Sequence, residues 1–178
     1  AVMALIGELA GRSLKDTPHG IDGCGIPVAG IPLEHLAMAF ARFATGDGLS
    51  ESRASAARQV YDAMVNEPFM VAGTNRWCTN AIEAGRGAFI VKTGAEGVYC
   101  AAIPEAGIGV ALKIDDGAHR ASECAMGAAL SKIPCLKALF ADSPTELIRA
   151  PVNNVVGKTV GEIAPGPALQ ELIITNPG

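Results

Sequence analysis

Residues 88–115 contain three apolar, β-prone runs separated by only a few residues each, and this pattern constrains the fold more than any other. The runs are AFIVKT, EGVYCAAI and IGVALKID, and the turn sequences between them are TGA and PEAG. Connections this short join antiparallel neighbours, because parallel strands need a long crossover. The sequence therefore predicts three neighbouring antiparallel strands.

Segments with apolar residues at helical spacing flank these runs on both sides. Pro32 stands where a first helical turn tolerates proline, and the apolar pattern after it continues to Gly46, so a helix is predicted there. Residues 17–32 are predicted to form a Gly/Pro-rich connection, and 152–165 one more strand. The other predicted helices are 1–10, 52–66, a short one over 74–84, 119–133 and a short one over 135–141.

The order of these elements predicts an α+β fold in which helices cover an antiparallel sheet. The chain has 178 residues, 49% hydrophobic and 18% charged, which excludes intrinsic disorder and fits a single unit. Aromatic residues make up only 4% of the chain, while glycine occurs 21 times. The core must therefore be built from small and aliphatic side chains at close backbone approach.

Charge and hydropathy argue against two classes of partner. Lys and Arg number 14 against 18 Asp and Glu, so no basic field attracts nucleic acid. No apolar stretch approaches the roughly 18 residues of a membrane span. Five cysteines are an odd number without close pairing, which favours free thiols in a reducing compartment. Since residues 1–10 also lack the basic region of a signal peptide, we expect a soluble, cytoplasmic protein.

Lys92, Thr93 and Gly94 stand at the end of a predicted strand, where serine acyl-transfer enzymes of the β-lactamase type place a cation against the substrate. The alternative is a strand-end lysine in a turn. The motif requires a nucleophilic serine with a lysine three positions later on a helix. No serine of this chain meets that condition; the serines are Ser13, Ser50, Ser52, Ser55, Ser122, Ser131 and Ser143.

Two further segments contain candidate site residues. Asp22 and Cys24 lie two positions apart in IDGCGIP, and in an extended segment both side chains face the same side. They are predicted to form the lip of a site, and the alternative is a turn with a small buried cysteine. Cys78, in TNRWCTN, is a candidate nucleophile, a site-lining thiol or a packing residue. The histidines are scattered without metal-ligand spacing.

Three separated blocks together resemble the C-terminal half of the rhizobial-type (class 3) L-asparaginases, the asparaginase II family. They are IDGCGIPVAGIPLEHLAMAFARF, PFMVAGTNRWCTN and IVKTGAEGVYCAAIPEAGIGVALKIDDGAHRA. The resemblance implies a serine β-lactamase/glutaminase-like fold whose N-terminal part is missing from this chain. Residues 1–178 are then the C-terminal part of a single asparaginase domain.

The resemblance implies hydrolysis of L-asparagine to L-aspartate and ammonia by two Ser-Lys pairs near a zinc site, in a homodimer. Lys92 matches the lysine of the second pair, and Asp22 matches the site aspartate that would bind the substrate's ammonium. Cys24 matches a zinc-ligand cysteine, and Cys78 a cysteine lining the site. Both serines, the first lysine and the remaining zinc ligands are expected in a stretch that precedes Ala1.

Substrate binding is expected from Thr93, Gly94 and Ala95 together with Asp22. By analogy with the fold, the backbone N–H near Ala95 forms one side of an oxyanion hole. The isolated chain is expected to be inactive, because it lacks the serine nucleophile. Two alternatives remain: a glutaminase or other amidase on the same fold, and a non-catalytic truncated partner or pseudoenzyme.

Overall fold

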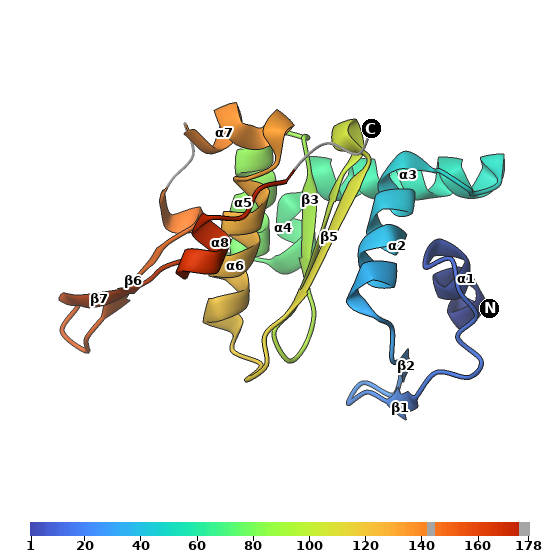
Figure 1. Cartoon of the computed structure of the whole chain (residues 1–178), viewed down its shortest axis with the longest axis horizontal. Coiled ribbons are helices and arrows are strands. Elements are labelled where there is room, and N and C mark those ends of the chain that lie inside the picture. Colours follow the sequence, from blue (N-terminus) through green and yellow to red (C-terminus); the bar gives the residue numbers. More distant parts are fainter. Residues whose placement is uncertain (142–144, 175–178) are drawn as a thin grey trace.

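The computed structural model describes residues 1–141 and 145–174, and at its centre lies a three-stranded antiparallel sheet (Figure 1). Its strands are β3 (Ile90–Thr93), β4 (Val98–Ile103) and β5 (Ile108–Lys113), in the order β3-β4-β5. The predicted three-stranded sheet is therefore confirmed. In its register, Lys92 lies opposite Cys100, and Cys100 lies opposite Ala111.

One face of the sheet packs against α5 (Trp77–Gly85) and α6 (His119–Leu130). Val91, Tyr99 and the following alternate residues of β4 point to this side, because side chains alternate between the faces of a strand. They are at most 1% exposed and form the larger hydrophobic core with the buried positions of both helices. The predicted helix that returns over the sheet is therefore present, although it ends three residues earlier than expected.

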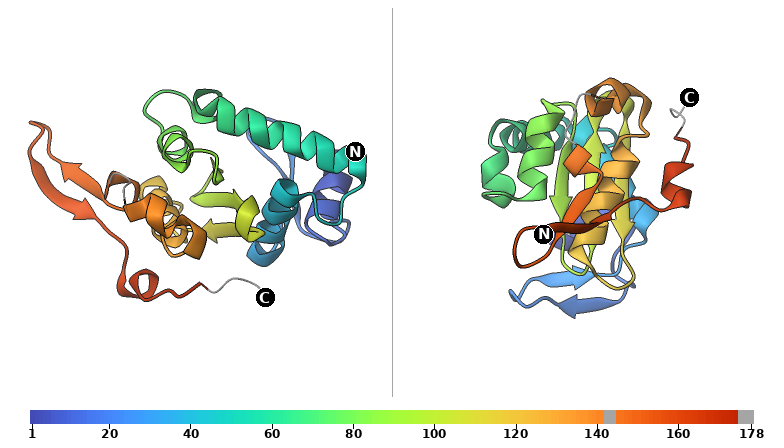
Figure 2. Two further views of the ribbon diagram at one scale, coloured as in Figure 1. Left: turned by 90° about the horizontal axis from the view of Figure 1, so that it is seen from above. Right: turned by 90° about the vertical axis from the view of Figure 1, so that its left-hand side faces the viewer.

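The other face carries α2 (Leu33–Thr45) and part of α3 (Glu51–Asn66), which close a smaller core around Ile90 and Ala102. Gly109 allows the close approach of α2 to β5, because a Cβ there would overlap the carbonyl oxygen of Ala37. Helices thus cover both faces of the sheet (Figures 1 and 2). This agrees with the predicted α+β class.

The N-terminal helix α1 (Val2–Leu9) is tied to both α2 and α3. The guanidinium of Arg42 donates to the carbonyls of Glu8 and Leu9, at 3.2 and 3.4 Å. Arg53 of α3 forms an ion pair with the Glu8 carboxylate. Figure 1 shows α1 at the edge of the molecule, with α2 between it and the sheet.

Two expectations about strands and connections are wrong. Residues 17–32 are not a plain connection, because β1 (His19–Ile21) and β2 (Pro27–Ala29) pair as a short hairpin. The C-terminal segment forms two strands instead of one, β6 (Ala150–Asn153) and β7 (Thr159–Ile163), because Asn154 and Gly157 close a turn between them. That hairpin projects on the side of the molecule opposite α1 (Figures 1 and 2).

The remaining elements are short. Pro68 ends α3 as predicted, but it also starts a further helix, α4, and the helix expected from residue 74 begins only at Trp77. The short helix predicted over 135–141 is divided into two elements, η2 and α7. Two further one-turn helices, η3 and α8, follow them in the chain. The bounds are α4 (Pro68–Ala72), η1 (Pro104–Ala106), η2 (Pro134–Leu136), α7 (Lys137–Ala141), η3 (Thr145–Leu147) and α8 (Pro167–Gln170).

Within residues 1–141 and 145–174, no single helix is long and apolar enough to cross a membrane. One pair, His119–Leu130 with Pro134–Ala141, reaches that length and composition together but is bent by 94°.

Candidate functional site

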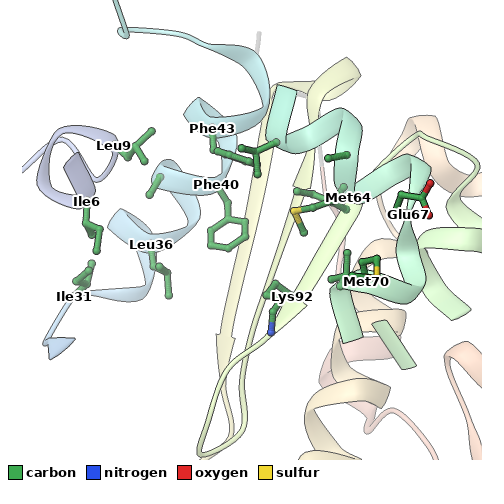
Figure 3. A pocket seen from close by; sticks show the side chains of 15 residues that line it. Ile6, Leu9, Ile31, Leu36, Phe40, Phe43, Met64, Glu67, Met70 and Lys92 are labelled. Atoms are coloured by element: carbon green, nitrogen blue, oxygen red, sulfur yellow. The ribbon is translucent and has the colours of Figure 1, made fainter. Parts of the chain in front are cut away.

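A groove of about 910 Å³ opens between α1 and α2 on one side and α3 and α4 on the other, with β3 at its base (Figure 3). Its lining is apolar except for two charged residues, Glu67 and Lys92. Glu67 stands where α3 meets α4, and Lys92 stands on the strand. The groove therefore has apolar walls and one positively charged side chain, Lys92, on the strand at its base.

Lys92 is the third residue of β3 and lies on the sheet face that carries α2. Its side chain is exposed, and Nζ donates to the carbonyl oxygen of Thr93 at 2.8 Å. No carboxylate among the described residues forms an ion pair with it. The amine is thus held by a neutral acceptor and keeps two donors for a ligand.

The residues after Lys92 form the tight turn that joins β3 to β4. Gly94 N–H donates to the carbonyl of Val98 at 2.8 Å, and Val98 N–H donates to the carbonyl of Ala95 at 3.1 Å. Glu96 and Gly97 have positive φ angles of 56° and 71°, as a two-residue hairpin turn requires. The Ala95 N–H has no partner within the described part of the chain. It is available to stabilise an oxyanion.

Asp22 and Cys24 occupy the exposed tip of the β1–β2 hairpin, so the expectation of an extended segment there is wrong. Gly25 adopts a φ of 82°, and its N–H closes the turn on the carbonyl of Asp22 at 2.8 Å. The Cys24 thiol lies 3.9 Å from the Asp22 carboxylate. Neither side chain lines the groove, although Ile31, just beyond the hairpin, does.

The described residues do not by themselves fit a zinc ion. Cys24 and Asp22 offer two donors, whereas zinc takes four in its structural sites. No group of three or more His, Cys, Asp or Glu residues that could hold a metal occurs within 1–141 and 145–174.

Residues 1–178 alone are expected to bind zinc weakly, because Cys24 lacks the further ligands that a tetrahedral site needs. Titration of the isolated chain against a competing chelator measures this affinity, and Cys24→Ser is the matched variant. One-to-one binding at submicromolar zinc that disappears in Cys24→Ser would contradict the expectation.

Cys78 lies on the opposite face of the sheet from Lys92, so the structure does not bring these two candidates together. The thiol is 1% exposed and lies 2.8 Å from the hydroxyl of Tyr99, whose ring meets Trp77 edge to face. Burial, followed by this hydrogen bond, raises the pKa of Tyr99. The phenol of Tyr99 is thus neutral at physiological pH, and the arrangement is that of a packed thiol–phenol pair.

A double-mutant cycle on Tyr99→Phe and Cys78→Ala is expected to give a coupling energy of about 1 kcal/mol, the usual net value of a buried hydrogen bond. Urea denaturation of the single and double variants measures it. The matched control pairs Tyr61→Phe with Cys78→Ala, because Tyr61 packs in the other core and bonds Gly87 instead. Equal coupling in the two cycles would refute a specific thiol–phenol contact.

Sequence reasoning missed the groove itself and the partner of Cys78. The alternation along β4 could have shown that Tyr99 faces away from Lys92, because Lys92 pairs with Cys100 and the neighbouring residue Tyr99 points to the other face. The groove had no such signal, since its walls come from helices that are distant in sequence.

Comparison with known families connects this geometry with an activity class. The model of the family described as L-asparaginase II matches residues 1–165. The chain belongs to the L-asparaginase II family. No curated protein matches the chain. Membership of this family indicates an amidohydrolase of the asparaginase type, and the match covers every candidate residue named above.

Proposed function

We propose that this chain supplies the Lys-Thr-Gly strand of a Ser-Lys amidohydrolase that converts L-asparagine to L-aspartate and ammonia. The observation that carries the proposal is the position of Lys92 on β3, at the base of the groove and without a carboxylate partner among the described residues. Family membership supplies the reaction class. The motif supplies the cation that acyl transfer needs beside the nucleophile.

In this reaction a serine hydroxyl adds to the side-chain amide carbon of asparagine, and ammonia leaves with the proton that the hydroxyl gave up. Water then cleaves the resulting ester, which releases aspartate and regenerates the hydroxyl. Lys92 lowers the barrier by orienting the hydroxyl and stabilising negative charge, and the Ala95 N–H donates to the oxyanion. Thr93 and Gly94 lie next to the bound substrate. Asp22 is proposed to bind the substrate's ammonium, which requires the tip of the β1–β2 hairpin to approach the groove, because Asp22 does not line the groove in this structure.

The nucleophile is proposed to come from outside these residues, because no serine of the chain starts a Ser-x-x-Lys sequence. On this proposal the chain is the C-terminal part of a rhizobial-type enzyme with a β-lactamase/glutaminase-like fold. Its N-terminal part provides both serines, the first lysine and the zinc ligands beyond Cys24. Dimerisation and a cytoplasmic location belong to the same proposal.

Residues 1–178 expressed alone are expected to release no ammonia from L-asparagine above background, because the serine nucleophile is absent. A coupled ammonia assay measures this, with the polypeptide that includes the upstream coding sequence as the positive control. Turnover by the sequence-verified isolated chain would contradict the Ser-Lys proposal, and loss of that turnover in Cys78→Ala would identify a thiol mechanism. Faster release from L-glutamine by the longer polypeptide would favour the glutaminase alternative.

A further inference from the structure

L-Asparagine carries a positive charge that Lys92 cannot bind. In the proposed reaction the side-chain amide of the substrate reacts beside Lys92, so its ammonium must point away from this cation, because like charges repel. An ammonium placed against apolar walls loses its hydration without gaining a partner, which costs free energy. The groove therefore needs an anion on a wall away from Lys92.

Glu67 is the one acidic residue among the described residues that line the groove. It lies on the wall formed by α3 and α4, whereas Lys92 lies on the strand at the base (Figure 3). The ion pairs among the described residues involve neither of these two side chains. The groove thus holds two opposite charges apart, which suits a substrate whose ammonium and reacting amide lie at different ends.

The Glu67 carboxylate has no structural partner among the described residues. Its backbone joins the two helices: its N–H donates to the Ala63 carbonyl at 2.9 Å, and its carbonyl accepts from the Met70 N–H at 3.0 Å. The side chain is exposed and makes no capping hydrogen bond to α4. The backbone is therefore fixed, while both carboxylate oxygens can accept hydrogen bonds from a ligand.

Packed elements fix the position of Glu67 relative to Lys92. Thr79 of α5 is buried, and its hydroxyl donates at 2.8 Å to the carbonyl of Gly73, the residue directly after α4. The helix α5 precedes β3 in the chain and shares the larger hydrophobic core with it. The junction that carries Glu67 is therefore anchored, through α4 and α5, to the strand that carries Lys92.

We propose that Glu67 is a specificity-determining residue, which binds the substrate's ammonium and selects α-amino acid amides over amides without an ammonium. The proposal rests on the proposed function, which places the reacting amide beside Lys92. Asp22 can share this ammonium when the hairpin tip approaches the groove, because an ammonium has three N–H donors. Glu67 differs from Asp22 in that it lines the groove in this structure.

The test compares L-asparagine with succinamate, which has the same carboxylate and amide but lacks the ammonium. It uses the enzyme that contains the nucleophile, in which Glu67→Gln keeps the size of the side chain and removes its charge. The kcat/KM for L-asparagine is expected to fall by about tenfold, the lower end of the contribution of a hydrogen bond to a charged group, because Glu67 is exposed. The inhibition constant of succinamate as a competitor should not change.

Glu83→Gln is the matched control, because Glu83 is an exposed glutamate of α5 that does not line the groove. Both constants should keep their wild-type values in this variant. An unchanged kcat/KM for L-asparagine in Glu67→Gln would overturn the proposal. An equal weakening of L-asparagine and succinamate would overturn it as well, because it would show a structural role and not a contact with the ammonium.

The wild-type enzyme separates this proposal from the proposed function. If it released no ammonia from L-asparagine, the proposed function would fail, and calorimetric titration of the same preparations would test Glu67 alone. Weaker binding of L-asparagine, but not of succinamate, by Glu67→Gln would support the ammonium contact. Equal binding of L-asparagine by the variant and the wild type would refute it.

Discussion

Replacing Lys92 with Met is expected to lower the turnover of L-asparagine by about 100- to 10,000-fold in the enzyme that contains the nucleophile, which is the usual contribution of a positioned proton-transfer group. Methionine keeps most of the apolar stem and removes the amine. The amine makes one hydrogen bond, to the adjacent carbonyl of Thr93, and lies at an exposed position, so folding should survive its loss. Ammonia release at saturating substrate and a urea denaturation curve together separate the two effects.

Lys113→Met is the matched control for this variant. Lys113 is the last residue of β5, and β4 separates β5 from the strand that carries Lys92. Its register partner Val98 and the Lys92 partner Cys100 are two residues apart, which places both lysines on one face. Lys113 also donates to the carbonyl of the residue after it, but it does not line the groove. Loss of turnover in Lys113→Met, with Lys92→Met within about threefold of wild type, would show that the wrong lysine was assigned.

The central sheet could be predicted from the sequence because its information is local. Three apolar runs with two short turns allow one economical pairing, and Glu96 and Gly97 adopt the positive φ angles that the first turn needs. The helices over the sheet follow from their apolar spacing, and their predicted ends differ from the observed ends by a few residues. Asn154 and Gly157 also indicate a turn. The residues around them are polar, so the sequence did not predict that the β6–β7 hairpin has two strands.

The candidate site could be predicted only in part. Lys92 was placed correctly at the end of a strand, because the motif and its strand are contiguous in the chain. Its relation to Cys78 and to the Asp22–Cys24 hairpin is tertiary, since it depends on which sheet face α5 covers and where the hairpin tip projects. The spacing of residues in the sequence determines neither the sheet face that α5 covers nor the direction of the hairpin tip. The apolar groove likewise arises from the separation of α1 and α2 from α3, which no single segment encodes.

Gly109→Ala is expected to destabilise the fold by about 3 kcal/mol, at the upper end of the usual cost of overpacking. The added Cβ would overlap the Ala37 carbonyl oxygen and approach the Ala41 nitrogen to 2.7 Å, and both are backbone atoms of α2 that cannot rotate away. Either α2 must move from β5 or the strand must bend. Because α2 forms one wall of the groove, the change should also weaken whatever binds there. Thermal unfolding should show a Tm lower by roughly 6 to 12 °C for a domain of this size.

Gly161→Ala separates this overlap from the general effect of replacing a strand glycine. Gly161 lies in β7 and has an ordinary strand backbone, and the nearest atom to an added Cβ is the Val152 Cβ at 4.0 Å. Alanine there only reduces the freedom of the unfolded chain, so it should be neutral or stabilising by about 0.4 to 1 kcal/mol. If both variants unfolded at the wild-type temperature, α2 would not pack on β5 at Gly109 as described. The groove wall that faces Lys92 would then have to be placed differently.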